Sequence, residues 1–417
     1  MYAEGLFPKQ SDKACKLKWS WSTIWLYQGY TASCHRCTKD KITPDNLLNF
    51  HNTPNKIKQR TDMLNNQWPG NGCEHCRDIE ELGGVSDRLT QNNIPNYPIE
   101  LESDANTLSV TPTTVEVFFD NTCNLSCIYC CARNSSKIYN ENKKYGEIPV
   151  ITKEQALPEK DLNYLENKRL FWEWMKINSI NIERFNILGG EPFMQDDFDD
   201  CLHFFNEYPN PQLTLTAVSN LIIRPSKFKQ YINKLKDLVD NKKLKSIDIT
   251  ASIDGWGAEE EFVRYGLDIS LFEQNMEYLI NQSDWLNVNI NQTLTSLTIK
   301  SVPDLIDKIN LWRNKKDIGH YVQKVIDREH LNPIHFGIDF WEDSFQKILK
   351  RLKQNTFNEK QAYNLFLGEY KRLQSVSNIN YEQLKNLFFY LDEIDKRRKT
   401  NWRDIFPYIA ELEKDVV

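Results

Sequence analysis

The sequence predicts an α/β fold: a partial (β/α)6 barrel of the TIM type, with a cysteine-rich module before it and a helical extension after it. Between residues 111 and 345, strand-like segments alternate with amphipathic helix-length segments. This alternation implies right-handed crossovers and a parallel sheet. Six such units make a partial barrel rather than a closed eight-stranded one. Residues 1–110 hold most of the cysteines, and residues 346–417 repeat apolar residues at helical spacing.

The expected strands are short and rich in Val, Ile, Thr and Phe, which favour extended structure. They are Thr114–Phe119, Arg184–Leu188, Leu213–Ser219, Ser246–Ile253, Leu286–Leu294 and Ile334–Trp341. The expected helices are Leu165–Asn178, Ser226–Asp240, Ser270–Asn281 and Val302–Arg313, followed in the extension by Phe345–Leu352, Gln361–Leu373 and Tyr381–Asp395. A proline-containing connector, Asn92–Pro112, leads into the first barrel strand.

Composition limits the possible partners. The net charge is −6, so the surface as a whole does not favour nucleic-acid binding. No apolar run reaches membrane-spanning length and no secretion signal is evident, so a cytoplasmic location without a membrane partner is expected. Residues 1–60 are an exception, because ten Lys and Arg against four Asp and Glu give them a local charge of +6. This segment is either a solvated basic face or a docking surface for an acidic peptide or a phosphate-bearing substrate.

Cysteines are concentrated in one third of the chain. Nine of the ten lie between Cys15 and Cys131, and the tenth is Cys201. Disulfides are rare in a reducing compartment, where clustered thiols usually bind metal. The cysteines therefore predict metal sites.

The first group follows the first barrel strand directly, with the spacing C-x3-C-x2-C at Cys123, Cys127 and Cys130. Three thiolates on one loop can hold three irons of a [4Fe–4S] cube and leave the fourth iron open to a small chelating molecule. A zinc knuckle is the alternative, but structural zinc takes four ligands, and Cys131 follows too closely to serve easily as the fourth.

Polar groups also end the later strands. Two glycines, Gly189 and Gly190, let the backbone approach a ligand closely and precede Glu191 and Pro192. Hydroxyl, amide, carboxylate and guanidinium groups follow at the third and fourth strand ends, where they could bind sugar hydroxyls or a carboxylate. These residues are Ser219, Asn220, Ser252, Asp254 and Arg264. The sequence does not decide whether Gln292, on the fifth strand, points into the barrel.

The segment CNLSCIYC, together with the later GGEP, resembles the radical S-adenosylmethionine (SAM) superfamily. The resemblance implies that Cys123, Cys127 and Cys130 ligate a [4Fe–4S] cluster whose open iron is chelated by the amino and carboxylate groups of SAM. It implies reductive cleavage of SAM to a 5′-deoxyadenosyl radical. The SAM-binding residues that it implies are Gly189, Gly190, Glu191, Pro192, Ser219, Asn220, Ser252, Asp254 and Arg264.

The second group of cysteines resembles the SPASM and twitch modules, which carry auxiliary clusters in many radical SAM enzymes. Cys15 is followed by Gly29-x4-Cys34, by Cys37 and by a C-x2-C pair. The resemblance implies a second [4Fe–4S] cluster, with Cys37 as a possible alternate ligand; its ligands would be Cys15, Cys34, Cys73 and Cys76. Zinc on Cys34, Cys37, Cys73 and Cys76 is the alternative. Such modules usually follow the barrel, whereas this one precedes it.

The resemblance implies hydrogen abstraction from an unactivated C–H bond of a substrate, with an electron donor such as flavodoxin or ferredoxin. A peptide substrate that is oxidised, crosslinked or epimerised is expected, with a small molecule or nucleoside as the alternative. A hypothesis of another class is a zinc-binding interaction protein with a degenerate barrel. The sequence names no catalytic residue.

Overall fold

The computed structural model describes residues 11–70, 72–81, 83–92, 108–150, 160–325, 328–376 and 379–416. Most of the expected connector, residues 93–107, lies outside this set. The described strands are β1 Trp21–Trp25, β2 Tyr30–Ala32, β3 Asp40–Lys41, β4 Thr114–Phe118, β5 Ser126–Cys127, β6 Arg184–Leu188, β7 Asn210–Ser219, β8 Leu244–Ser252, β9 Arg264–Tyr265, β10 Leu286–Leu294 and β11 Ile318–Lys324.

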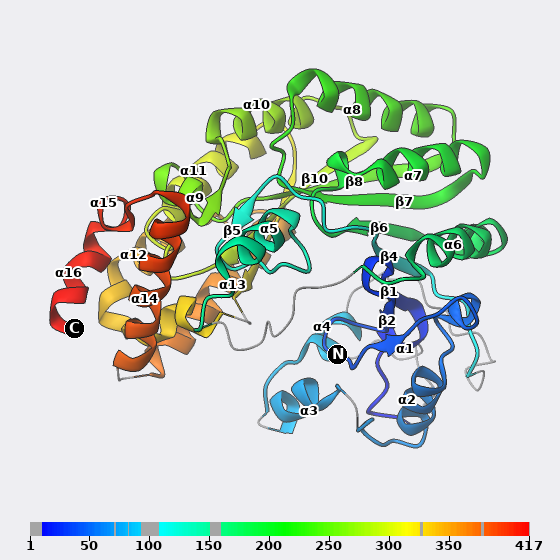
Figure 1. The fold of residues 1–417 in the computed structure, drawn as a ribbon, viewed down its shortest axis with the longest axis horizontal. Coiled ribbons are helices and arrows are strands. Elements are labelled where there is room, and N and C mark those ends of the chain that lie inside the picture. Colours follow the sequence, from blue (N-terminus) through cyan, green and yellow to red (C-terminus); the bar gives the residue numbers. More distant parts are fainter. Residues whose placement is uncertain are drawn as a thin grey trace.

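Nine of these strands form one sheet in the order β11-β10-β8-β7-β6-β4-β1-β2-β3, and β5 pairs with β9 separately. Every neighbouring pair from β11 to β1 is parallel, whereas β1, β2 and β3 pair antiparallel. Figure 1 shows the sheet curving across the molecule, with helices following its outer side. The expectation of an α/β fold with a large parallel sheet is confirmed.

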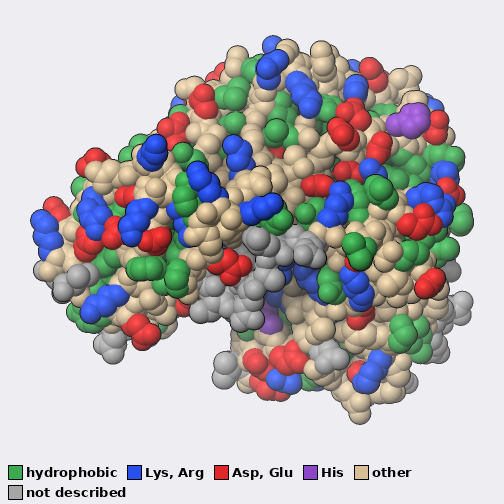
Figure 2. Space-filling model, in the orientation of Figure 1, with side chains coloured by type: hydrophobic (Ala, Val, Ile, Leu, Met, Phe, Trp, Pro, Cys, Tyr) green, Lys and Arg blue, Asp and Glu red, His purple; other side chains and the backbone are tan. Residues whose placement is uncertain are grey.

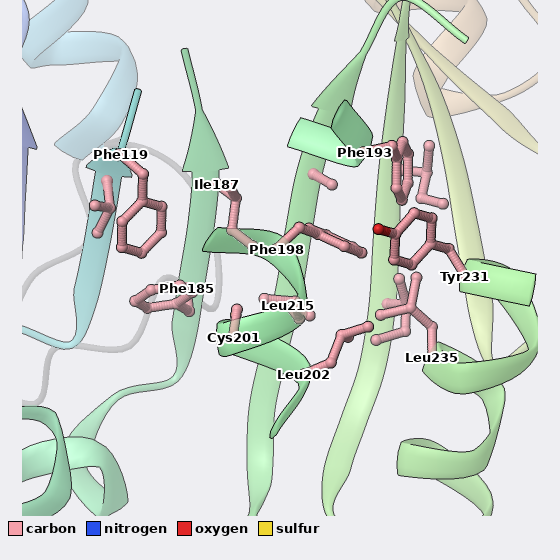
Figure 3. Packing of buried hydrophobic residues seen from close by; sticks show 14 of the residues in the cluster. Phe119, Phe185, Ile187, Phe193, Phe198, Cys201, Leu202, Leu215, Tyr231 and Leu235 are labelled. Carbon is pink, nitrogen blue, oxygen red and sulfur yellow. The ribbon is translucent and has the colours of Figure 1, made fainter. Parts of the chain in front are cut away.

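Helices cover one face of the parallel strands because their apolar sides pack on it. Phe171, Phe198 and Phe228, from three successive helices, are fully buried against strand residues such as Phe185. Figure 3 shows this packing, with Phe193 and Tyr231 filling the space beside Phe198. The helices flanking these strands are α5 Ser136–Tyr145, α6 Tyr164–Asn178, α7 Asp196–Glu207, α8 Pro225–Asp240, α9 Ala258–Val263, α10 Ile269–Ile280 and α11 Val302–Arg313.

The N-terminal part continues the same sheet. Strand β1 pairs in parallel with β4 over five residues, from Trp21 opposite Thr114 to Trp25 opposite Phe118. The sheet therefore crosses the expected boundary at residue 110, and it brings the N-terminal cysteines beside the first barrel strand. The helices of this part are α1 Leu17–Ser20, α2 Pro54–Leu64, α3 Glu74–Glu81 and α4 Asp87–Asn92.

The C-terminal helices form a second apolar core with the β10–β11 end of the sheet. Trp341, Trp402 and Phe366 are buried there with Leu294 and Val302. None of the described helices is long and apolar enough to cross a bilayer. Figure 2 shows the surface hollowed between these helices and the N-terminal part. The helices are α12 Ile338–Arg351, α13 Phe357–Gln374, α14 Tyr381–Arg398, α15 Trp402–Ile405 and α16 Pro407–Val416.

One expected strand is wrong. Residues 334–341 are not extended, because Pro333–Phe336 forms a 3-10 turn and α12 begins at Ile338. Gly337 joins the two with a φ of 76°, which interrupts extended backbone. The parallel strand that follows β10 is instead β11, which pairs with β10 from Val288 opposite Ile318 to Leu294 opposite Lys324.

If β1 is an integral strand of the sheet, Ile24 belongs to the main core, where its side chain is 0% exposed. Ile24→Ala should lower the free energy of unfolding by about 2–5 kcal/mol, the usual result of removing a buried branched side chain. Urea titration followed by tryptophan fluorescence measures this. Ile177→Ala is the matched control, since Ile177 is 77% exposed, and it should change stability by less than about 0.5 kcal/mol. Equal effects would contradict the placement of β1.

Candidate active site

The cysteine loop begins where β4 ends and is held by backbone contacts on both sides. Cys127 lies in β5 and pairs with Arg264 of β9. Ser135 caps α5 by accepting from the Ile138 N–H at 3.3 Å, and its hydroxyl donates to the Leu125 carbonyl at 2.8 Å. The start of α5 therefore anchors the loop on which all three cysteines lie.

The two glycines that follow β6 allow their turn to dock on this loop. The Glu191 N–H donates to the Thr122 carbonyl at 2.8 Å, and the Gly190 N–H donates to the Asn134 carbonyl at 3.2 Å. Gly190 has a φ of 53°, and a Cβ atom there would lie 2.1 Å from the Thr122 oxygen. Only glycine fits this approach. The structure thus brings Gly189, Gly190 and Glu191 together with the cysteine loop.

The Glu191 carboxylate is fully buried and joins the ends of two strands. It accepts hydrogen bonds from the Ser219 hydroxyl at 2.7 Å and from the Asn220 N–H at 2.7 Å. Burial raises the pKa of Glu191 to about 7, and these hydrogen bonds oppose the increase. The Asn220 amide nitrogen lies 4.0 Å from the Cys123 sulfur, so the end of β7 also reaches the cysteines.

Asp254 and Arg264 form a buried pair beneath Cys127. The Arg264 Nε and Nη2 donate to the two Asp254 oxygens at 2.9 and 3.0 Å, and Nη1 lies 4.0 Å from the Cys127 sulfur. The Tyr129 hydroxyl also donates to Asp254, at 2.5 Å. The structure therefore brings these two predicted residues together, but they bind each other. Ser252 is buried at the end of β8.

Two further buried groups support this pair. Glu260 accepts from the Asp254 and Gly255 N–H groups at 3.0 and 2.8 Å, and burial raises its pKa to about 8. Gln292 is fully buried on the face of β10 that also carries Val288 and Ile290. Its amide nitrogen donates to the Asp254 carbonyl at 2.7 Å, and its amide oxygen lies 2.8 Å from His320 Nε2. Burial lowers the pKa of His320 to about 3, so the imidazole is neutral and adds no charge to these hydrogen-bonded residues.

Residues far along the chain also hold the cysteine loop, and sequence reasoning missed them. The Tyr390 hydroxyl, from α14, donates to the Ile128 carbonyl, and Arg328 Nη2 donates to the Cys130 carbonyl at 2.8 Å. Arg398 forms an ion pair with Glu141 of α5. No local pattern marks these residues, because their partners are 198 to 262 positions away.

The cysteine loop suits a metal cluster, in which each thiolate binds a different metal ion, better than it suits a single ion. In the described part of the chain, no three His, Cys, Asp or Glu side chains are arranged to hold a single metal ion. A [4Fe–4S] cube differs, because each thiolate binds its own iron. Burial raises the pKa of the Cys123 thiol to about 11 and that of Cys127 to about 12, so these thiols ionise at neutral pH only when a cation compensates them. Three thiols carried on one loop, each able to bind its own iron, fit the group.

The N-terminal cysteines come together around a buried lysine. The Cys34 and Cys37 sulfurs are 3.1 Å apart, and the Lys18 ammonium donates to Cys37 at 2.6 Å and to Gln59 at 2.7 Å. Cys37 and Cys34 pack with Phe118 at the end of β4. Burial by itself would lower the pKa of Lys18, but the electrostatic effect of the neighbouring cysteines, with Cys37 first, raises it above its usual value. The lysine was not a predicted site residue.

The remaining predicted ligands lie close to this pair of sulfurs. The Cys73 thiol is hydrogen-bonded to Cys37, and this contact and burial raise the Cys73 pKa. Burial raises the pKa of the Cys15 thiol to about 11, and the charges of Cys37 and Cys76 add to the increase. The structure thus brings Cys15, Cys34, Cys37, Cys73 and Cys76 into one neighbourhood, with Cys37 at its centre rather than at its margin.

No protein-family model and no curated protein sequence matches the chain. Among solved structures, the Streptococcus suis SuiB bound to precursor peptide SuiA has 12% identity and a TM-score of 0.37, covering 88% of this chain and 71% of SuiB. SuiB bound to S-adenosylmethionine has 13% identity and a TM-score of 0.35, and the match covers 89% of this chain and 72% of SuiB. TYW1 with a lysine-pyruvate adduct bound has 16% identity and a TM-score of 0.29, and the match covers 56% of this chain and 70% of TYW1.

The docking of Gly190 on Thr122 can be tested in the metal-free chain. Gly190→Ala should push the cysteine loop away and expose Cys127, because backbone rather than a flexible side chain opposes the new Cβ. Alkylation of Cys127 by iodoacetamide, followed by mass spectrometry, should accelerate by about tenfold or more, as expected when local opening becomes easier by about 1.4 kcal/mol.

Gly257→Ala is the matched control for this test. Gly257 also has a positive φ, of 76°, but nothing lies within 4 Å of the position of its Cβ. It should add backbone strain alone and leave alkylation of Cys127 nearly unchanged. An unchanged rate for Gly190→Ala would show that the glycine contact does not hold the loop.

Proposed function

We propose that the chain is a radical SAM enzyme. The observation that supports this best is that the ends of four parallel strands meet at one C-x3-C-x2-C loop. Strand β4 leads into the loop, the turn after β6 binds its backbone, and Asn220 after β7 approaches Cys123. Arg264, paired with Asp254 after β8, approaches Cys127. Carboxyl ends of parallel strands are where such folds place their chemistry.

Cys123, Cys127 and Cys130 would hold a [4Fe–4S] cluster, which when bound supplies the electron that cleaves SAM to a 5′-deoxyadenosyl radical. The chain's own residues keep the loop in place and exclude water. Tyr390, Arg328 and Ser135 bind its carbonyls, so no loop carbonyl at these positions is left unpaired in the interior. Arg264 places a positive charge next to the Cys127 sulfur, where a thiolate is stabilised.

SAM would lie against the strand ends that border the loop. We assign it to Gly189, Gly190, Glu191 and Pro192, to Ser219 and Asn220, and to Ser252, Asp254 and Arg264. The structure favours different roles within this set. The glycine turn is packed against the cysteine loop, and Glu191 and Asp254 have their oxygens engaged by neighbouring residues. These two carboxylates therefore act as positioning groups for the backbone that surrounds the cofactor.

The N-terminal cysteines would hold an auxiliary [4Fe–4S] cluster. Phe118 supports a connection between the two groups, because it packs with Cys34 and Cys37 and would also contact a Cβ at Gly189, 2.9 Å from its ring. An auxiliary cluster at this position could accept an electron from a substrate radical. Zinc on Cys34, Cys37, Cys73 and Cys76 is the alternative.

We further propose hydrogen abstraction from a peptide, with SAM as cosubstrate and flavodoxin or ferredoxin as electron donor; a small molecule or nucleoside is the alternative substrate. In this proposal, residues 1–110 form the auxiliary module, residues 111–345 form a partial (β/α)6 barrel, and residues 346–417 form a helical extension. The barrel would comprise β4, β6, β7, β8, β10 and β11 with their helices.

Replacing Cys127 with Ala should abolish SAM cleavage, because Asn124, Leu125 and Ser126 cannot replace a thiolate on soft iron. About four irons should be lost and the N-terminal metal retained. Cys201→Ala is the matched control, since Cys201 is equally buried but lies in the apolar core. Anaerobic iron analysis and assay of 5′-deoxyadenosine measure the outcome. Cleavage by the Cys127 variant would refute the ligand assignment.

The nature of the N-terminal metal can be decided with Cys73→Ala and Cys76→Ala together. If these residues hold a cluster, about four irons should be lost, and SAM cleavage should persist because it needs only the first cube. If they hold zinc, zinc should be lost with full iron retained, and the main defect should be in stability. Measuring both metals beside wild type distinguishes the two; loss of zinc alone excludes the auxiliary cluster.

A further inference from the structure

A cavity of about 520 Å³ lies where the N-terminal strands face the segments that precede α5 and α6. Three separate stretches contribute cations to its wall: Lys39 and Lys41 beside β3, Arg133 after the cysteine loop, and Lys160 before α6. The lining contains one carboxylate, Asp161. The cavity therefore gathers part of the basic charge that residues 1–60 carry.

These cations are only partly compensated. Asp161 forms an ion pair with Lys41, while Lys160 is 3.6 Å from Asp120. Within the described residues, neither Lys39 nor Arg133 forms an ion pair; the Lys39 ammonium instead lies 3.8 Å from the centre of the Trp25 ring. Four cations against Asp161 in the wall and Asp120 beside it leave a positive potential, which attracts anions.

Gly29 explains how the wall is built. Its φ is 71°, and a Cβ atom there would lie 2.7 Å from the Asp161 carboxylate and 2.8 Å from the Lys41 ammonium. The bare backbone lets this ion pair sit on the turn between β1 and β2. The glycine of the Gly29-x4-Cys34 pattern thus has a role in shaping the cavity.

The cavity adjoins both cysteine groups. Lys39 is two residues after Cys37, and Arg133 is three residues after Cys130. A ligand held here would lie beside the loop proposed to generate the radical.

We propose that this cavity binds an acidic segment of a peptide through at least two carboxylates. Its volume is within the range of ligand sites, roughly 300–1,000 Å³, and exceeds what a single small anion fills. Its cations come from three segments, which suits separate carboxylates along a chain. Tyr30 and Leu162 in the lining offer apolar contact to the residues between them. The binding itself stands on the cavity, while its meaning as a substrate anchor rests on the proposed function.

The test measures binding of fluorescein-labelled hexaglutamate and hexaglutamine to the full chain by fluorescence anisotropy, without SAM or reductant. Hexaglutamate should bind more tightly, and its affinity should fall as NaCl is added. Replacing Arg133 and Lys160 with Gln should weaken hexaglutamate binding by about tenfold, as expected for the loss of two charged contacts. Lys353→Gln with Lys360→Gln removes the same charge from exposed positions on the C-terminal part and should change affinity by less than about twofold.

Equal weakening by both double variants would overturn the proposal, because it would show attraction by net charge alone. Failure of hexaglutamate to bind more tightly than hexaglutamine would also overturn it, and binding of inorganic pyrophosphate to the same chain, measured by calorimetry, would then favour a phosphate site. Iron content and thermal unfolding of the variants exclude misfolding, and Lys160→Gln alone serves if the double variant does not fold. Because SAM cleavage is assayed separately, failure of the anchor and failure of the radical chemistry are distinguishable.

Discussion

The close approach of Gly190 to the Thr122 carbonyl is the contact on which the candidate site depends. It places the turn after β6 directly on the cysteine loop, with a gap too small for a side chain. Glu191 then extends the contact to Ser219 and Asn220, so three strand ends are joined through buried hydrogen bonds. Breaking any one of these hydrogen bonds would leave a buried polar group unpaired, which is costly in the interior, so the bonds stabilise the three strand ends together.

Buried charge organises the other side of the loop. Arg264 is shared between Asp254 and Glu260, with a distance of 3.2 Å to the latter, and is almost fully enclosed. Removing one partner of such a network leaves an uncompensated charge, which costs about 3–5 kcal/mol. The C-terminal helices add Tyr390 to this support, so the extension acts on the cysteine loop as well as packing against the sheet. The candidate site is therefore built from residues far apart in the sequence.

Local patterns in the sequence predict those strands and motifs whose formation depends on residues close together in the chain. The bounds of β6 and β10 match the expected strands because each is a short, β-rich run, and the three cysteines share one loop because their spacing is local. Strand β11, with the sequence IGHYVQK, lacks such a run, whereas the apolar stretch after Pro333 resembles a strand although it forms a 3-10 turn and the start of α12. Pairing of β1 with β4, the burial of Lys18 among thiols and the hydrogen bond of Tyr390 depend on distant residues, for which no local signal exists.

The central claim is that this loop holds a cluster that cleaves SAM. The most direct measurement incubates the iron-loaded chain anaerobically with SAM and dithionite and quantifies 5′-deoxyadenosine and methionine by mass spectrometry. We expect both products in equal amounts. If the enzyme cleaves SAM repeatedly without substrate, the moles of each product should exceed the moles of protein. A chain with a full complement of iron that forms neither product would contradict the claim.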